Sequence, residues 1–195
     1  MITKAPILLA SNSPRRQEIM RNAGFEFEVK VRNVEEYIPE DMHPRAVAVM
    51  ISENKAKAYD DLSNDYIIVT ADTIVGLEGR AFGKPADEVE AVAMLNRLSG
   101  RSHTVTTGVT IFHGGRFKSF AEETYVSFRR LTDAEIAHYV TQYQPFDKAG
   151  AYGIQEWIGM IGITRIEGDY YNVVGLPVGK LYQELLAFRP MAEEN

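Results

Sequence analysis

The segment Ile7–Glu18 constrains the fold of this chain more than any other part of the sequence. A short apolar run typical of a buried strand leads into small polar residues, a proline and two adjacent arginines. Ser13 is a favourable N-cap and the proline suits a first helical position, so the segment predicts a strand followed by a helix over Pro14–Ala23. The free N–H groups of such a helix start, together with Arg15 and Arg16, favour an anionic ligand such as a phosphate.

The next segments extend this start into an α/β pattern. Phe25–Val31 alternates between apolar and polar residues, as a half-buried strand does, and His43–Asp61 has apolar positions near helical spacing. Tyr66–Ala71 predicts a short apolar strand that delivers Asp72 at its C-terminal end. Ligands bind at the carboxyl ends of strands in open α/β sheets, so this placement is itself a sign of function.

Turn and capping signals divide the second half of the chain into further helices and strands. Capping-box patterns start helices at Asp87 and Thr132, and Gly114-Gly115 predicts a hairpin between two long strands. A last hairpin is expected around Glu167-Gly168-Asp169. The expected ranges are a helix to about Leu98, strands over Thr104–His113 and Arg116–Phe128, a helix that stops before Pro145, a further segment over Tyr170–Val174, and a terminal helix from Pro177 to about Phe188.

Length and composition narrow the class of protein. The 195 residues predict one α/β domain spanning residues 1–195, with a mixed sheet wrapped by helices. The chain has no cysteine, which excludes disulfides and thiol chemistry, and the spacing of its four histidines matches no metal motif. A net charge of −6 argues against a broad nucleic-acid surface. No apolar run approaches a membrane span, so a cytoplasmic location without membrane contact is expected.

Six blocks of the sequence together resemble the Maf family of nucleoside triphosphate pyrophosphatases, in the family's order and from about Ile7 to about Leu185. The blocks are Ile7–Glu18, Ser52–Ala58, Ala71-Asp72-Thr73, Gly83-Lys84-Pro85, Leu98–His103 and Asp147–Gln155. The resemblance implies the two-lobed fold that this family shares with inosine triphosphate pyrophosphatases, with a curved mixed sheet and a central cleft. It also implies hydrolysis between the α and β phosphates, dependence on Mg²⁺ or Mn²⁺, and frequent homodimers, although no motif here shows a dimer.

The resemblance assigns roles to acidic residues in these blocks and just before them. It places the catalytic aspartate at Asp72, which would also hold the metal, whereas the alternative for a lone Asp before Thr is to brace a turn. Glu36 matches a family position that helps hold the metal, and Glu35 is the alternative if the register shifts by one. Magnesium sites in phosphoryl-transfer enzymes commonly use one or two carboxylates together with substrate oxygens.

The same resemblance, together with the basic character of the blocks, predicts a phosphate-binding set. Lys55 and Lys57 cannot share one face of a helix, and the family match selects Lys55. Lys84 lies between a glycine and a proline that fix the backbone from which it reaches. The predicted phosphate-binding residues are Ser11, Arg15, Arg16, Lys55, Lys84 and Lys148.

Three positions separate the family branch acting on dTTP and UTP from the branch acting on 7-methyl-GTP, and here they match Arg15, Thr73 and Gln155. All three fit the dTTP/UTP branch. The sequence departs from that branch just after Gln155, where Glu156–Gly159 replaces a glycine-rich continuation and adds about one residue. The departure affects the loop beside the base and brings in Trp157, which either stacks on a base or packs in the core. The alternatives are a 7-methyl-GTP pyrophosphatase and a nucleotide-binding regulator of cell division or septum formation.

Overall fold

The computed structural model describes residue 3, residues 5–39 and residues 41–188. Within these residues the strands form a seven-stranded mixed sheet in the order β2-β1-β3-β5-β6-β7, with β4 paired to β3. The pairs β1–β2 and β1–β3 are parallel and the other pairs are antiparallel. The strands are β1 (Ile7–Leu9), β2 (Phe27–Val29), β3 (Ile67–Leu77), β4 (Arg80–Phe82), β5 (Ser102–His113), β6 (Arg116–Phe128) and β7 (Ile163–Glu167).

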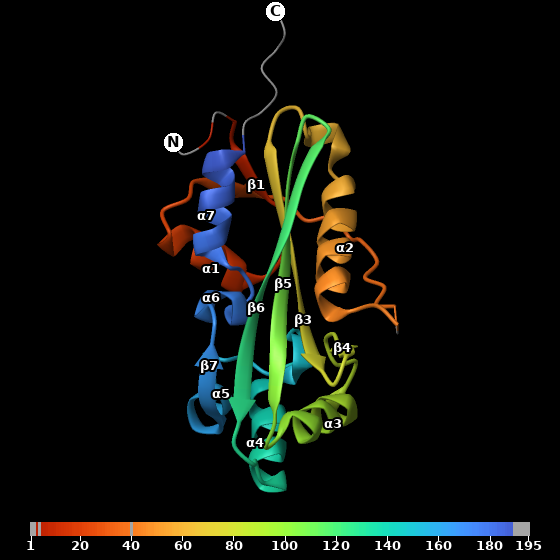
Figure 1. Ribbon diagram of the computed structural model, residues 1–195, viewed down its shortest axis with the longest axis vertical. Helices are drawn as coiled ribbons and strands as arrows, with labels where there is room; N and C mark the ends of the chain where they lie inside the picture. Colours follow the sequence, from red (N-terminus) through yellow and green to blue (C-terminus); the bar gives the residue numbers. More distant parts are fainter. Residues whose placement is uncertain (1–2, 4, 40, 189–195) are drawn as a thin grey trace, which may run out of the picture.

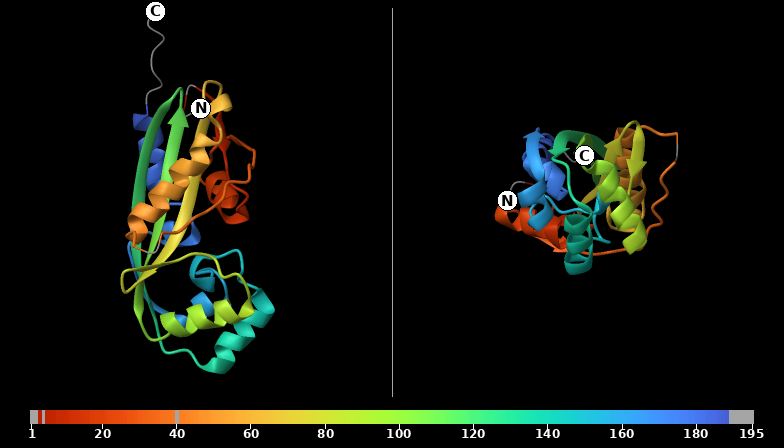
Figure 2. Two further views of the ribbon diagram at one scale, coloured as in Figure 1. Left: turned by 90° about the vertical axis from the view of Figure 1, so that its right-hand side faces the viewer. Right: turned by 90° about the horizontal axis from the view of Figure 1, so that it is seen from below.

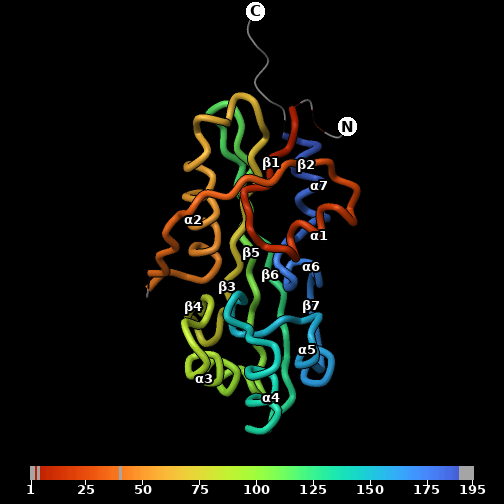
Figure 3. The backbone as a smooth tube through the Cα atoms, turned by 180° about the vertical axis from the view of Figure 1, so that it is seen from behind, coloured from red at the N-terminus to blue at the C-terminus, as the bar shows by residue number. Residues whose placement is uncertain are grey.

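Helices cover this sheet in two groups that lie toward opposite ends of the molecule (Figures 1 and 2). The first group, with α1, α2 and α7, forms the first lobe, and the second group, with α3, α4 and α5, forms the second lobe. The long strands β3, β5 and β6 run through both groups, and Figure 3 shows β1 and β2 at the end that holds α7. The helices are α1 (Pro14–Asn22), α2 (Pro44–Lys57), α3 (Glu88–Leu98), α4 (Asp133–Tyr143), α5 (Trp157–Gly162), α6 (Tyr170–Val174) and α7 (Val178–Ala187), with short 3₁₀ turns at Asp60–Leu62 and Ala149–Ala151.

The central strands are buried on both faces because helices cover each side of the first lobe. Neighbouring residues of β3 point to opposite faces, so Ile68 packs with residues of α2 whereas Val69 packs with α1 and α7. Helix α2 lies very close to β5 at Gly108, where a Cβ atom would come within 2.3 Å of the backbone of Ala48. Glycine is therefore required at this position for the helix to reach the sheet.

The second lobe has its own core, built by α3, α4 and α5 around the far ends of the long strands. Its buried residues include Leu95, Ile136, Tyr139 and Ile158. The helix starts expected from the sequence are confirmed. The Thr132 side chain accepts a hydrogen bond from the Glu135 N–H in a complete capping box, and the Asp87 carboxylate accepts one from the Glu90 N–H.

The predicted hairpin is also confirmed, with Gly114 and Gly115 in left-handed conformations at φ +54° and +75°. The expected strand over Phe25–Val31 is shorter in the structure, because among the described strands β2 pairs with β1 alone and its residues are half-buried or exposed. In the part of the chain that the structure describes, no helix has the length and apolar character needed to cross a membrane.

Two sequence-based expectations are wrong. The strand expected to end at Ala71 continues to Leu77, so Asp72 lies in the middle of β3, paired with Gly108, and not at a C-terminal strand end. The hairpin expected around Glu167-Gly168-Asp169 is the end of β7 followed by the helix α6. The Asp169 carboxylate accepts a hydrogen bond from the Tyr171 N–H and so starts a helix where a turn into a strand was expected.

Candidate functional site

The two lobes enclose a cavity of about 650 Å³ that is lined by both of them. Its walls come from the end of β1 and the start of α1, the loop between β2 and α2, the middle of β3, the turn before α3, and residues 147–155. A smaller hollow of about 320 Å³ adjoins it and shares the side chains of Glu36, Asp72, Thr73 and Lys84. Every residue assigned to a site from the sequence lines the main cavity, although the assignments came from six separate segments.

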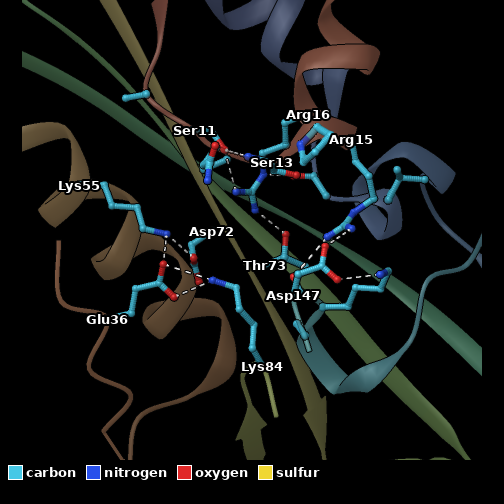
Figure 4. A pocket seen from close by; sticks show the side chains of 18 of the residues that line it. Ser11, Ser13, Arg15, Arg16, Glu36, Lys55, Asp72, Thr73, Lys84 and Asp147 are labelled. Carbon is cyan, nitrogen blue, oxygen red and sulfur yellow. Dashed lines mark hydrogen bonds and ion pairs between the residues drawn. The ribbon is translucent and has the colours of Figure 1, made fainter. Parts of the chain in front are cut away.

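Asp72 and Glu36 meet at one lysine on the wall of this cavity (Figure 4). The Lys55 Nζ atom lies 2.6 Å from Asp72 Oδ1 and 2.8 Å from Glu36 Oε1. The Asp72 side chain is only 6% exposed because β3 is covered on both faces. The second oxygen of Glu36 is 3.1 Å from Lys84 Nζ, which reaches across from the other lobe. Two carboxylates and two ammonium groups therefore form one ion cluster.

The charge state of this cluster follows from its contacts. Partial burial alone would raise the pKa of Glu36, but the ion pairs with Lys55 and Lys84 outweigh it and lower that pKa to about 2. Glu36 is thus a carboxylate at any physiological pH. Glu35 is exposed and lies outside the lining of the cavity, and Lys57 is exposed and hydrogen-bonds Asn54, so the structure separates both from the site.

The start of α1 forms a second, basic wall. Ser13 occupies the N-cap without a side-chain capping bond, and its N–H donates to Ser11 Oγ at 3.3 Å. The Arg16 guanidinium donates to the Gly175 carbonyl at 2.7 Å, to Thr73 Oγ1 at 3.0 Å and to Ser11 Oγ at 3.4 Å. Burial lowers the pKa of Arg16, while the nearby Asp72 charge opposes that effect. Three of its five N–H groups are committed to protein atoms, so Arg16 shapes the wall as well as charging it.

Arg15 and Lys148 are joined by Asp147, a residue that sequence reasoning did not single out. Arg15 NH1 lies 2.7 Å from Asp147 Oδ2, and Lys148 Nζ lies 2.7 Å from Asp147 Oδ1. Burial tends to raise the pKa of Asp147, but its bonds to Lys148 and Arg15 lower it overall. This contact spans the cleft, from α1 in one lobe to the loop after α4 in the other (Figure 4). Nothing local in the sequence indicates a pair separated by 132 residues.

The residues expected to select the base lie at different depths. Thr73 is partly buried, and its hydroxyl hydrogen-bonds Arg16 and the hydroxyl of Thr107. Gln155 lines the cavity with an exposed side chain. Trp157 lines neither of these two cavities. It is partly buried, packs against the core of the second lobe, and meets the His138 ring edge-on with 4.9 Å between the ring centroids. Of the two expectations for Trp157, the structure favours packing over stacking on a base.

The carboxylates of the cavity fit a divalent metal only together with ligands from outside the protein. Among the described residues, no group of three or more His, Cys, Asp or Glu side chains could hold a metal ion by itself. Asp72 and Glu36 supply two carboxylates, and both contact the Lys55 Nζ atom. Mg²⁺ commonly binds one or two protein carboxylates when substrate phosphates and waters complete its coordination shell. The residues present fit a metal that arrives with a phosphate ligand.

These features define a mixed α/β protein whose cleft combines fixed cations with a pair of carboxylates, an arrangement suited to a polyphosphate. Comparison with known proteins identifies the family. The chain belongs to the Maf family, because a family model described as "Maf-like protein" matches residues 6–188.

Curated relatives support this assignment over nearly the whole chain. A protein of Phocaeicola vulgatus is 47% identical over 186 residues, which cover 94% of this chain and 96% of the relative. A protein of Bacteroides fragilis is 48% identical over 181 residues, covering 92% and 94%, and one of Cytophaga hutchinsonii is 46% identical over 190 residues, covering 97% and 87%. Each of these relatives is named "dTTP/UTP pyrophosphatase".

Proposed function

We propose that this protein hydrolyses dTTP and UTP to the nucleoside monophosphate and pyrophosphate, with a divalent metal as cofactor. The observation that carries the proposal is the convergence of Arg15, Arg16, Lys55, Lys84 and Lys148 on one cavity that also contains Asp72 and Glu36. The cavity volume of about 650 Å³ lies within the range of roughly 300–1,000 Å³ typical of small-molecule sites. The names of the close relatives give the same reaction.

In the proposed complex, different walls of the cavity would bind different parts of the nucleotide. The basic wall at the start of α1 and the lysines from the second lobe would hold the β and γ phosphates. Asp72 and Glu36 would hold the metal, which when bound would polarise the phosphate oxygens and offset their charge. Gln155, in the segment at the opposite wall, would face the base. In this arrangement the α phosphorus lies near Asp72.

The reaction itself needs a water activated beside Asp72. The water oxygen forms a bond to the α phosphorus, its proton passes to the Asp72 carboxylate, and the bond from the α phosphorus to the bridging oxygen breaks. Pyrophosphate leaves with the bridging oxygen. Lys55, Lys84 and Lys148 stabilise the negative charge that builds on it, and fixed donors of this kind contribute on the order of 10²–10³ in rate each.

A panel of nucleoside triphosphates incubated with Mg²⁺ tests the proposal, with pyrophosphate and orthophosphate measured separately. We expect stoichiometric pyrophosphate and monophosphate from dTTP and UTP, and much slower turnover of the other common nucleotides. Orthophosphate as the first product would refute the bond assignment. Preferred turnover of 7-methyl-GTP would move the protein to the other family branch, and tight nucleotide binding without any product would favour a regulatory role.

A further inference from the structure

A buried tyrosine of α4 lies directly behind the segment that carries Gln155. The Tyr139 hydroxyl donates a short hydrogen bond to Glu156 Oε2 and accepts one from the Gly153 N–H at 3.0 Å. The tyrosine residue is 0% exposed, so it cannot contact a nucleotide in the cavity. Burial and the adjacent Glu156 carboxylate raise the pKa of Tyr139, which keeps the phenol protonated and able to donate.

Glu156 closes the same segment from its other end. Its backbone N–H donates to the Gly153 carbonyl at 3.0 Å, and its side chain packs so closely that a Cβ atom on Gly153 would come within 2.8 Å of Glu156 Cδ. One phenol oxygen therefore contacts both ends of a four-residue turn. Gln155 lies inside this turn and is the member of the turn that extends into the cleft with an exposed side chain.

The network continues from Glu156 to the basic wall of the cavity. Glu156 Oε1 lies 3.1 Å from Lys148 Nζ, whose side chain is 9% exposed, and Lys148 contacts Asp147, which holds Arg15. The residues matched to base selection, Gln155 and Arg15, are thus connected through Glu156, Lys148 and Asp147. Breaking a buried link in such a network leaves its partners unsatisfied and loosens what they hold.

We propose that Tyr139 and Glu156 are positioning residues for base selection, which fix the turn Gly153–Glu156 so that Gln155 meets the base edge in one orientation. The inference rests on the proposed function, since it specifies how the same site distinguishes nucleotides. This role also gives a reason for Glu156–Gly159, the segment by which the sequence departs from the glycine-rich continuation of the dTTP/UTP branch. Glu156 supplies a side-chain anchor at a position where a glycine-rich continuation would have none.

The test is Tyr139→Phe, which removes one oxygen and keeps the ring that packs in the core. The matched control is Tyr143→Phe on the same helix, because the Tyr143 ring stacks on Tyr139 at 5.0 Å and is 40% exposed. We expect Tyr139→Phe to reduce the ratio of kcat/KM for dTTP over dCTP by about tenfold, as the loss of one positioning hydrogen bond implies. The change should lie in KM, with kcat for dTTP reduced less than about twofold because the ion cluster at Asp72 is untouched. The control should match the wild type.

A second measurement separates positioning from general stability. Amide hydrogen exchange at Gly153 should accelerate in Tyr139→Phe, because that N–H loses its acceptor, while the amides of β5 keep their protection. Glu156→Gln retains an acceptor for the phenol and should keep more of the nucleotide preference than Glu156→Ala. An unchanged preference and unchanged exchange in Tyr139→Phe would overturn the proposal. An equal loss of kcat on every nucleotide in Tyr139→Phe would also overturn the proposal.

Equilibrium binding distinguishes failure of this inference from failure of the proposed function. Calorimetry with α,β-imido-dTTP and α,β-imido-dCTP measures base preference without turnover. A wild-type preference that Tyr139→Phe reduces supports the positioning role even if dTTP proves not to be hydrolysed. Equal affinity of the wild type for both analogues would refute it.

Discussion

Replacing Lys55 with methionine tests the electrostatic balance of the ion cluster. The Lys55 ammonium contacts Asp72 at 2.6 Å and Glu36 at 2.8 Å, so the two carboxylates lie within about 5.5 Å of each other, a range in which like charges interact strongly. Two such charges about 5 Å apart, at an effective dielectric constant of about 20, repel by roughly 3 kcal/mol. Methionine keeps most of the aliphatic packing of lysine and removes only the charge.

The expected loss of unfolding free energy in Lys55→Met is about 2–3 kcal/mol near neutral pH, because Lys84 remains 3.1 Å from Glu36 and offsets part of the repulsion. In a protein of this size each kcal/mol corresponds to a change of roughly 2–4 °C in Tm, so the midpoint should fall by about 4–12 °C. The repulsion acts only while both carboxylates are charged, so protonation of either one removes it. The destabilisation should therefore be small at about pH 4 and grow as the pH rises toward neutrality.

Urea denaturation and thermal melts at several pH values, with and without Mg²⁺, measure these effects. Added Mg²⁺ should restore part of the lost stability by replacing the missing cation between the carboxylates, while nucleotide turnover stays low because a phosphate contact is gone. The matched control is Lys57→Met, two residues along the same helix, where the exposed ammonium contacts only Asn54 among the contacts seen in the structure. If Lys55→Met is as stable as Lys57→Met at every pH, the two carboxylates do not interact as described.

Three further predictions concern the reaction and its base selection. Asp72→Asn should fold normally and lose at least about 10²-fold in kcat, because an amide cannot accept the proton of water; near-normal pyrophosphate release would remove Asp72 from the mechanism. Gln155→Ala should lose about 10- to 100-fold in kcat/KM on dTTP and UTP and narrow the gap to other nucleotides, and an equal loss on every nucleotide would mean that Gln155 does not read the base. The pKa of Glu36 is lowered from 4.5 to about 2, so its contribution to stability should be present above about pH 4.5 and disappear as the pH falls toward 2. Acid titration of unfolding should show a smaller decrease over this range in Glu36→Gln than in the wild type.

Local signals in the sequence were sufficient for much of the fold. The helix starts at Thr132 and Asp87 and the turn at Gly114-Gly115 depend on residues within four positions of each other, so neighbouring residues alone determine them. The strand around Asp72 was harder to delimit. Two polar residues, Asp72 and Thr73, interrupt an apolar run, and a sequence pattern cannot distinguish a strand end from a polar site in mid-strand.

The missed parts of the site depend on contacts between distant segments. Asp147 meets Arg15 across 132 residues, and Tyr139 meets Glu156 from a different helix. Tyr139 has the pattern of a core residue on an amphipathic helix, and its hydroxyl becomes significant only when the turn after Gly153 folds against it. The residue matches with the family identified the side chains that line the cavity. They did not identify Asp147, the carboxylate that holds Arg15 and Lys148 in place.

This pairing of charges has a consequence for how a nucleotide can enter the cleft. Each of the lysines proposed to bind phosphate already contacts a carboxylate: Lys55 contacts Asp72 and Glu36, Lys84 contacts Glu36, and Lys148 contacts Asp147. A phosphate can take Lys55 only if another cation then neutralises the buried Asp72 carboxylate and the partly exposed Glu36 carboxylate, because an unpaired buried charge costs several kcal/mol. A triphosphate that carries a divalent cation can bind Lys55 through a phosphate while its metal neutralises the carboxylates. A metal-free triphosphate leaves the two carboxylates facing its own negative charge. We therefore expect nucleotide affinity to fall steeply when the metal is chelated. The fall should be at least as steep in Lys55→Met, because Lys84 is then the cation that remains beside the two carboxylates.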